Sequence, residues 1–114
     1  MTDNILSENS MDFAVDILTF LNTFSGHSSL KSQLERSGTS IGANIREANY
    51  AQSKADFVSK MQIALKECYE TEYWLELFER AGVCEKEALK KLKHDCGSLR
   101  RLLIASINTA KKAQ

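Results

Sequence analysis

The chain has 114 residues and no net charge, because 15 basic residues balance 15 acidic ones. This is the length of one domain, and a neutral chain has no overall electric field that would attract nucleic acid or a membrane surface. The sequence contains no proline and only five glycines. This composition predicts an all-α protein with a single domain over residues 1–114.

The number and spacing of the cysteines and the lengths of the apolar runs indicate the cellular compartment in which the protein resides. The odd number of cysteines suits no disulfide framework, and no pair among Cys68, Cys84 and Cys96 has CxxC spacing. No basic segment followed by an apolar one marks a secretory signal at the N-terminus, and no apolar run approaches the roughly 18 residues of a membrane span. We therefore expect a reduced, soluble protein in the cytoplasm that does not enter a membrane.

Four segments with helical periodicity follow one another along the chain. Residues 1–8 are expected to form a polar, loosely held start. The first predicted helix then covers about residues 9–25 and is capped by Asn9 or Ser10. Its core face is expected to consist of two apolar rows: Met11, Ala14, Leu18 and Leu21, and Phe13, Ile17, Phe20 and Phe24.

The other three predicted helices cover about residues 29–51, 54–81 and 85–111. Ser28 or Ser29 is the expected N-cap of the second helix. Short connections place consecutive helices side by side and antiparallel. The sequence therefore predicts an antiparallel up-down-up-down four-helix bundle.

The second predicted helix carries an apolar stripe and a polar stripe. Gly38 and Gly42 are poor helix formers, and an amphipathic helix that tolerates them is the commoner explanation. The alternative is that two glycines four residues apart let another helix approach closely, beside a satisfied polar network. The residues expected to form this network across the second and third helices are Arg36, Ser40, Asn44, Glu47, Glu67 and Glu70.

The third predicted helix begins at a capping box, from Ser53 to Asp56, and ends at Gly82. Its apolar residues cover more of its circumference than one bundle can bury. A large apolar patch that faces water is rare on a monomer and usually marks an interface. The outward apolar residues expected at a boundary between subunits are Ile63, Tyr73, Trp74 and Leu77.

The run RSGTSIGANIREA and the helix after it resemble the bacterial four-helix-bundle family of 23S rRNA-intervening-sequence proteins. The family pattern is roughly R-x-x-x-S-I-x-x-N-I-x-E-[GA], followed by a helix whose matching part begins with phenylalanine. Gly42 and Arg46 depart from the pattern, because many members have proline and a small residue there. The matching residues are Arg36, Ser40, Ile41, Asn44, Ile45, Glu47, Ala48, Phe57, Ala64, Leu65, Glu67 and Glu70.

This resemblance, which covers the chain from about Asp12 to Ala110, implies an up-down four-helix bundle that assembles into a homo-oligomer, a pentameric ring. Most members of the family have no assigned activity. The accessory protein of diversity-generating retroelements is a relative of the family, is similar in fold, and binds nucleic acid and a reverse transcriptase.

The sequence shows no constellation of residues for catalysis or metal binding. A di-iron site in a bundle needs Glu-x-x-His on two helices, and this motif is absent although Glu67 and Glu70 have the right spacing. The two histidines, His27 and His94, form no visible pair with a nucleophile. We expect no enzyme, no cofactor, no metal and no small-molecule substrate.

Charge is distributed unevenly along the chain. Residues 1–27 carry four acidic residues and no lysine or arginine, whereas residues 83–114 carry eight basic and three acidic residues. A basic stripe on the last helix is most simply a solvated face. It also gives an alternative function, a nucleic-acid-binding accessory protein that holds RNA or DNA phosphates through Lys86, Lys90, Lys93 and Arg101.

Nucleic-acid-binding domains are usually strongly basic, and this chain is neutral. The main hypothesis is therefore a non-enzymatic, homo-oligomeric scaffold or adaptor protein that associates with itself through the second and third helices.

Overall fold

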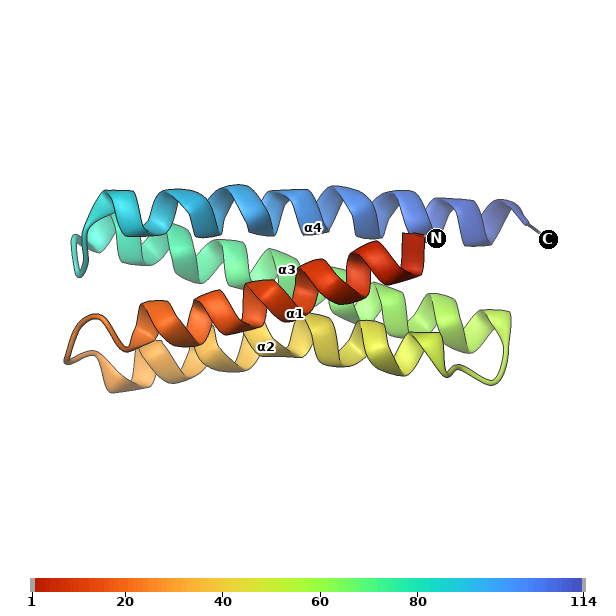
Figure 1. Ribbon diagram of the computed structural model, residues 1–114, viewed down its shortest axis with the longest axis horizontal. Helices are drawn as coiled ribbons and strands as arrows, with labels where there is room; N and C mark the ends of the chain where they lie inside the picture. Colours follow the sequence, from red (N-terminus) through yellow and green to blue (C-terminus); the bar gives the residue numbers. More distant parts are fainter. Residues whose placement is uncertain (1, 114) are drawn as a thin grey trace.

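The computed structural model describes the backbone of residues 2–113 and the side chains of residues 5–113. This part of the chain forms four α-helices: α1 (Thr2–Leu21), α2 (Ser28–Asn49), α3 (Lys54–Ala81) and α4 (Lys86–Lys112). Consecutive helices run in opposite directions and are joined by short connections (Figure 1). Residues 2–113 contain no strand. The predicted all-α, up-down-up-down four-helix bundle is confirmed.

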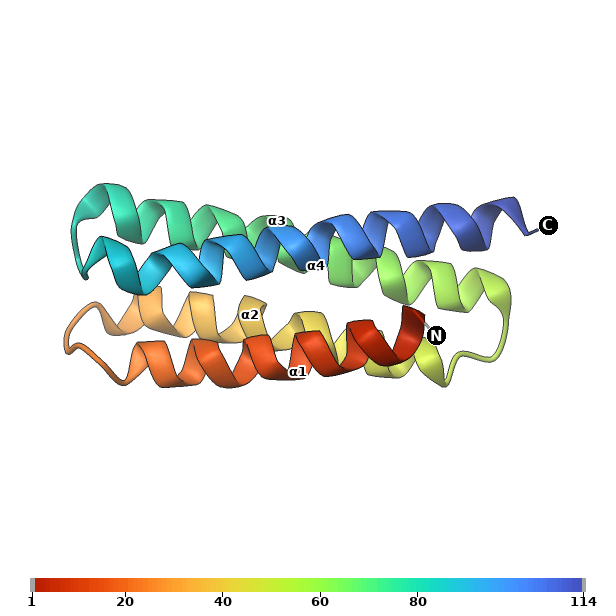
Figure 2. The ribbon, with the colours of Figure 1, turned by 45° about the horizontal axis from the view of Figure 1, so that its top comes forward.

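The helices surround one elongated core. α1 packs against α2 and α4, α3 packs against the same two helices, and α1 therefore lies diagonally across the bundle from α3 (Figures 1 and 2). The bundle measures 47 × 20 × 19 Å. None of the described helices is long and apolar enough to span a bilayer.

The start of α1 differs from the prediction. The helix begins at Thr2 rather than near Asn9 or Ser10, and it ends at Leu21 rather than near residue 25. The reason is Leu6, which is fully buried and therefore holds the supposedly loose N-terminal segment against the core. The expectation of a polar, loosely held start is wrong for the described residues.

The core face of α1 is also narrower than predicted. One row is buried, and its members are Leu6, Ser10, Phe13, Ile17, Phe20 and Leu21. Met11 and Leu18, expected in the core, are 48% and 44% exposed. They lie roughly 120° around the helix from the buried row, at 3.6 residues per turn, where neither α2 nor α4 covers them.

Close packing of α1 on α2 explains why only one row fits. A Cβ atom at Gly38 would lie 3.0 Å from Cγ1 of Ile17, and a Cβ atom at Gly42 would lie 3.1 Å from Oγ of Ser10. Both distances are too short for an ordinary contact. The glycines therefore permit close approach of a second helix, which was the less common of the two explanations, and that helix is α1.

The ends of α3 follow the predicted signals. The Ser53 side chain accepts a hydrogen bond from the Asp56 backbone N–H at 3.1 Å. The Asp56 carboxylate accepts from the N–H of Gln52 at 3.4 Å, one residue before the position that a capping box would use. Gly82 ends the helix in the left-handed conformation with φ 67°.

The start of α2 does not follow its predicted signal. The N-cap residue is His27, which has φ 55° and makes no side-chain capping bond. Neither Ser28 nor Ser29 is the cap, because the chain turns through two successive left-handed residues, Gly26 and His27. The helix therefore starts immediately after the turn, and both serines lie inside it.

Candidate functional site

A charged junction joins the middle of α2 to the middle of α3. The Arg36 guanidinium forms ion pairs with both Glu67, at 3.3 Å, and Glu70. Trp74 Nε1 donates a hydrogen bond to the Glu70 carboxylate at 3.1 Å. The hydrogen bond from Arg36, and then that from Trp74, hold the pKa of Glu70 below its ordinary value.

The other three residues of the predicted network do not join this junction. The Ser40 hydroxyl donates to the Arg36 carbonyl at 2.6 Å, and the Asn44 side chain donates to the Ser40 carbonyl at 2.9 Å. Both contacts stay within α2, because short polar side chains reach the carbonyl one turn back. Glu47 pairs separately with Lys60 of α3 at 3.0 Å. The predicted network is therefore a three-residue junction and a separate ion pair.

A buried hydroxyl pair between α2 and α3 was missed by the sequence reasoning. Ser37 and Thr71 are both fully buried, and their side-chain oxygens are hydrogen-bonded at 2.9 Å. A signal was present in the sequence of α3, where the apolar residues Cys68 and Leu75 lie on one face of the helix with one helical position of that face between them. Thr71 occupies that position and continues the buried face of the helix.

The outward face of α3 carries part of the predicted interface patch. Tyr73 is 60% exposed, and Ile63 is also exposed. Trp74 and Leu77 are half-buried, and Trp74 packs against the core and edge-on to the Tyr73 ring, with centroids 5.0 Å apart. Tyr69, which was not among the predicted residues, is exposed as well. We call Ile63, Tyr69, Tyr73 and Leu77 the α3 patch.

A second exposed apolar surface lies on α1, and the sequence analysis placed two of its residues, Met11 and Leu18, in the core. Val15 is 53% exposed and lies between Met11 and Leu18 on the outward side of the helix. The three residues are spaced as i, i+4 and i+7, so they form one row along the helix. We call Met11, Val15 and Leu18 the α1 row.

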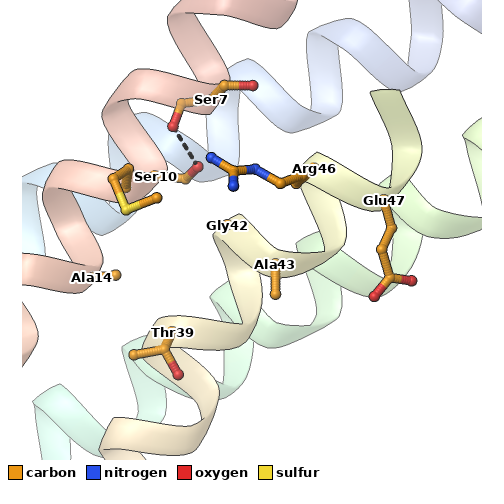
Figure 3. A pocket seen from close by; sticks show the side chains of 9 residues that line it. Ser7, Ser10, Ala14, Thr39, Gly42, Ala43, Arg46 and Glu47 are labelled. Atoms are coloured by element: carbon orange, nitrogen blue, oxygen red, sulfur yellow. Dashed lines mark hydrogen bonds between the residues drawn. The ribbon is translucent and has the colours of Figure 1, made fainter. Parts of the chain in front are cut away.

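A groove runs between α1 and α2 beside the α1 row (Figure 3). Its volume is about 480 Å³, and most of its lining is small side chains. Arg46 reaches from α2 toward Ser7 and Ser10 of α1, whereas the Glu47 carboxylate points away from α1 (Figure 3). The lining residues are Ser7, Ser10, Met11, Ala14, Thr39, Gly42, Ala43, Arg46 and Glu47.

The predicted basic stripe on α4 is partly neutralised by acids. Lys93 pairs with Glu79 of α3 at 2.5 Å, and this hydrogen bond lowers the pKa of Glu79. Lys90 lies 3.9 Å from Glu87 in its own helix. Lys86 is exposed.

Arg101, the last residue of the stripe, is exposed and donates to the Ser98 hydroxyl at 3.3 Å. Elsewhere on α4, Arg100 pairs with Glu72 at 3.0 Å, and Lys91 pairs with Asp16 and Asp95. Lys86 and Arg101 are therefore the most available cations of the predicted set.

All three cysteines are free thiols, and Cys68 and Cys96 are buried. Contact with Cys68 and burial raise the pKa of the Cys96 thiol. Within residues 5–113 no group of three or more His, Cys, Asp or Glu side chains is arranged to hold a metal ion.

The family is settled by a match over nearly the whole chain. The family model described as 23S rRNA-intervening sequence protein matches residues 2–105. This chain belongs to that family. None of the curated proteins compared with it matches.

One solved protein structure is similar to this chain over nearly its whole length. It is a protein of unknown function from the S23 ribosomal protein family of Bacteroides thetaiotaomicron, and it is 44% identical in sequence. The alignment covers 95% of this chain and 99% of that one, with a TM-score of 0.88. The relative therefore supports the bundle architecture and leaves the role of the family open.

The two departures of this chain from the family pattern, Gly42 and Arg46, both line the α1–α2 groove. Gly42 leaves the groove open because it has no side chain, and Arg46 places a positive charge at the edge of the groove (Figure 3).

Proposed function

We propose that this protein is a non-enzymatic, homo-oligomeric scaffold or adaptor, and that its subunits meet through the outward face of α3. The observation that carries the proposal is the α3 patch, where Tyr73 and Tyr69 are more than half exposed although the core of the bundle is complete without them. Tyrosines are enriched in protein interfaces and a cluster of exposed apolar side chains usually marks one.

The resemblance to the family supports a ring of five chains as the assembled state. Such a ring has five times the 12.8 kDa mass of one chain. Cytoplasmic location is part of this proposal, because the three free cysteines suit a reducing compartment.

The test compares the solution masses of the wild type and two variants by light scattering. Tyr73→Asp places a charge in the α3 patch, and Tyr50→Asp places the same charge at a residue that is 82% exposed outside it. We expect Tyr73→Asp to lower the mass and Tyr50→Asp to keep that of the wild type. Replacing Tyr73 is a cleaner test of the interface than replacing Trp74 by alanine. The Trp74 side chain is hydrogen-bonded to the Glu70 carboxylate, so its loss would also destabilise the bundle.

Two results would contradict the proposal. One is a wild-type protein that is a monomer at micromolar concentration, and the other is a Tyr73→Asp variant that keeps the wild-type mass. Circular dichroism of each variant checks that the helical fold is intact.

The second candidate function is nucleic-acid binding through α4. It is favoured by the eight basic residues within residues 83–114 and by the exposure of Lys86 and Arg101, and the name of the family refers to ribosomal RNA. Contacts would be to phosphates, so the binding constant should fall with salt with a log–log slope of about 0.9 per phosphate neutralised on duplex DNA.

Fluorescence anisotropy with RNA and DNA duplexes at two salt concentrations measures this slope. Charge reversal of Lys86, Lys90 and Arg101 should abolish binding, and reversal of Lys54, which is exposed on α3 outside the α3 patch, is the control. Affinity that is independent of salt, or that survives the α4 substitutions, would exclude α4 as the binding site.

A further inference from the structure

We propose that the groove between α1 and α2 binds a small amphipathic carboxylate, with the carboxylate held by Arg46 and the apolar body lying between the two helices. The groove is outside the α3 patch, so this inference is independent of the proposed function. A linear alkanoate of medium length, such as octanoate, is the simplest ligand of this class.

The groove has the size and the lining of a small-molecule site. Its volume of about 480 Å³ falls within the range of roughly 300–1,000 Å³ that is usual for ligand pockets, which are mostly apolar with a few polar groups. Ala14 of α1 and Ala43 of α2 have short side chains and Gly42 has none, which leaves the groove open (Figure 3). Met11 also lines the groove and is 48% exposed. An apolar ligand body would therefore cover apolar side chains that otherwise face water.

The two ends of the groove differ in polarity. α1 and α2 are antiparallel, and Gly42 lies directly beside Ser10. Toward the start of α1 the groove ends at Ser7 and Arg46, whereas its other end is formed by small side chains around Ala14 (Figure 3). Ser7 and Ala14 are about 10 Å apart along the helix at 1.5 Å per residue. A ligand with one charged end and an apolar chain of about this length matches the groove.

Arg46 supplies the positive charge at the polar end. Its guanidinium reaches toward Ser7 and Ser10 of α1 (Figure 3), and it forms no ion pair or hydrogen bond with another described residue. Glu47, the acidic residue of the lining, pairs with Lys60 at 3.0 Å, and its carboxylate points away from α1. The guanidinium is therefore available to a ligand, and its planar fork binds a carboxylate through two parallel hydrogen bonds.

Ser7 adds a hydroxyl donor beside Arg46. The hydroxyl oxygen accepts a hydrogen bond from the Asn49 side chain at 3.0 Å, and its own hydrogen has no acceptor among residues 5–113. This hydrogen can be donated to a ligand oxygen. Ser10 does not compete for that role, because its hydroxyl donates to the Ser7 carbonyl at 3.1 Å. One guanidinium and one hydroxyl suit the two oxygens of a carboxylate better than the three oxygens of a phosphate group.

Isothermal titration calorimetry with three probes separates the parts of this site. Octanoate carries the charge and the chain, octanol carries the chain without the charge, and acetate carries the charge without the chain. We expect octanol and acetate each to bind at least about tenfold more weakly than octanoate. The reason is that each lacks either the charged hydrogen bonds or most of the buried apolar area.

Variants in the groove test the role of Arg46. Arg46→Ala should weaken octanoate binding by about tenfold or more and leave octanol binding unchanged. Ala43→Glu places a carboxylate one helical turn from Arg46, where it competes with the ligand, and should abolish octanoate binding. Both positions are exposed, so each variant should keep the bundle fold. Arg101→Ala, at an exposed arginine of α4, is the matched control and should bind octanoate as the wild type does.

Amide chemical shifts of isotopically labelled protein locate the bound ligand. Octanoate should shift the resonances of Ala14, Thr39 and Ala43 in the groove and leave those of Tyr69 and Tyr73 in the α3 patch unchanged.

Four results would overturn the inference. They are no binding of octanoate at millimolar concentration, octanol that binds as tightly as octanoate, octanoate affinity that Arg46→Ala leaves unchanged, and chemical-shift changes centred on the α3 patch. Circular dichroism checks the fold of each variant. Should Arg46→Ala lose its helical spectrum, Arg46→Gln removes the same charge and replaces it in the test.

Discussion

At the scale of single residues, the buried hydroxyls of Ser37 and Thr71 are a polar contact inside an apolar interface. Thr71 Oγ1 also lies 2.7 Å from the Glu67 carbonyl, whereas the other contact of Ser37, with the Leu34 carbonyl, is 3.5 Å long. Loss of Thr71 Oγ1 therefore leaves Ser37 without a good partner. A buried polar group that has lost its hydrogen-bond partner lowers the stability of the protein by about 1–3 kcal/mol.

We predict that Thr71→Val lowers the free energy of unfolding by more than the double variant Ser37→Ala/Thr71→Val does. The double variant removes both hydroxyls, and replacing both partners of a hydrogen bond by apolar groups is nearly neutral. Urea denaturation at one protein concentration measures the difference. A double variant that loses the sum of the two single losses would show that the hydroxyls do not depend on each other.

Two glycines in helix interiors should respond to alanine in opposite ways. At Gly97 the nearest atoms to the new Cβ would be the ends of the Arg101, Arg100 and Glu72 side chains, at 3.4, 3.6 and 3.9 Å, which are ordinary contact distances. Gly97→Ala should therefore stabilise the protein by about 0.5–1 kcal/mol through helix propensity.

At Gly38 the new Cβ would lie 3.0 Å from Cγ1 of Ile17, which is fully buried in the core. Overpacking of a core costs about 1–3 kcal/mol, so we expect Gly38→Ala to melt at a lower temperature than Gly97→Ala and than the wild type. Equal stabilisation by the two alanines would mean that α1 and α2 are not held at this close distance.

At the scale of helices, the N-terminal turns of α1 should contribute to stability through Leu6. Truncation of a buried leucine to alanine costs about 2–5 kcal/mol. We predict a loss of this size for Leu6→Ala and a small effect for Ile5→Ala, because Ile5 is 53% exposed. Thermal melts of the two variants make the comparison, and equal melting temperatures would contradict the docking of this segment.

The junction between α2 and α3 should stabilise the bundle in a pH-dependent way. The folded-state pKa of Glu70 is below its ordinary value of 4.5, so its contribution is present above pH 4.5 and is lost as the pH falls through the folded-state pKa. Arg36 is 49% and Glu70 33% exposed, so solvent screening limits the contribution to about 0.2–1 kcal/mol.

The variant Glu70→Gln should accordingly be less stable than the wild type at neutral pH and equal to it in strong acid. Urea denaturation at several pH values follows the difference. A difference that stays constant down to acid pH would show that the Glu70 charge does not carry the effect.

The ends and the buried face of some helices could be predicted from the sequence more accurately than those of others, for physical reasons. α3 was predicted at both ends, because Ser53 and Gly82 supply local signals that do not depend on the rest of the fold. α1 was predicted less well, because two apolar rows share the helix and only the position of α2 determines which row is buried. The site divides in the same way: Arg36, Glu67 and Glu70 meet as predicted, whereas the exposure of Met11 and Leu18 depends on tertiary packing.

At the scale of the whole molecule, the bundle is only about 20 Å wide, so every helix keeps one face outside the core. α1 and α3 are the two diagonal helices (Figure 2). On both, that face carries apolar side chains that a monomer leaves in water. The apolar residues of the chain therefore exceed what one bundle buries. We infer that the functional unit is an assembly of several chains.

The mass of the wild-type protein in solution tests this central claim most directly. Light scattering over a range of micromolar concentrations should give an integer multiple of 12.8 kDa greater than one, and five for the proposed ring. A mass of 12.8 kDa at every concentration would contradict the account, because the outward faces of α1 and α3 would then be stable in water without a partner.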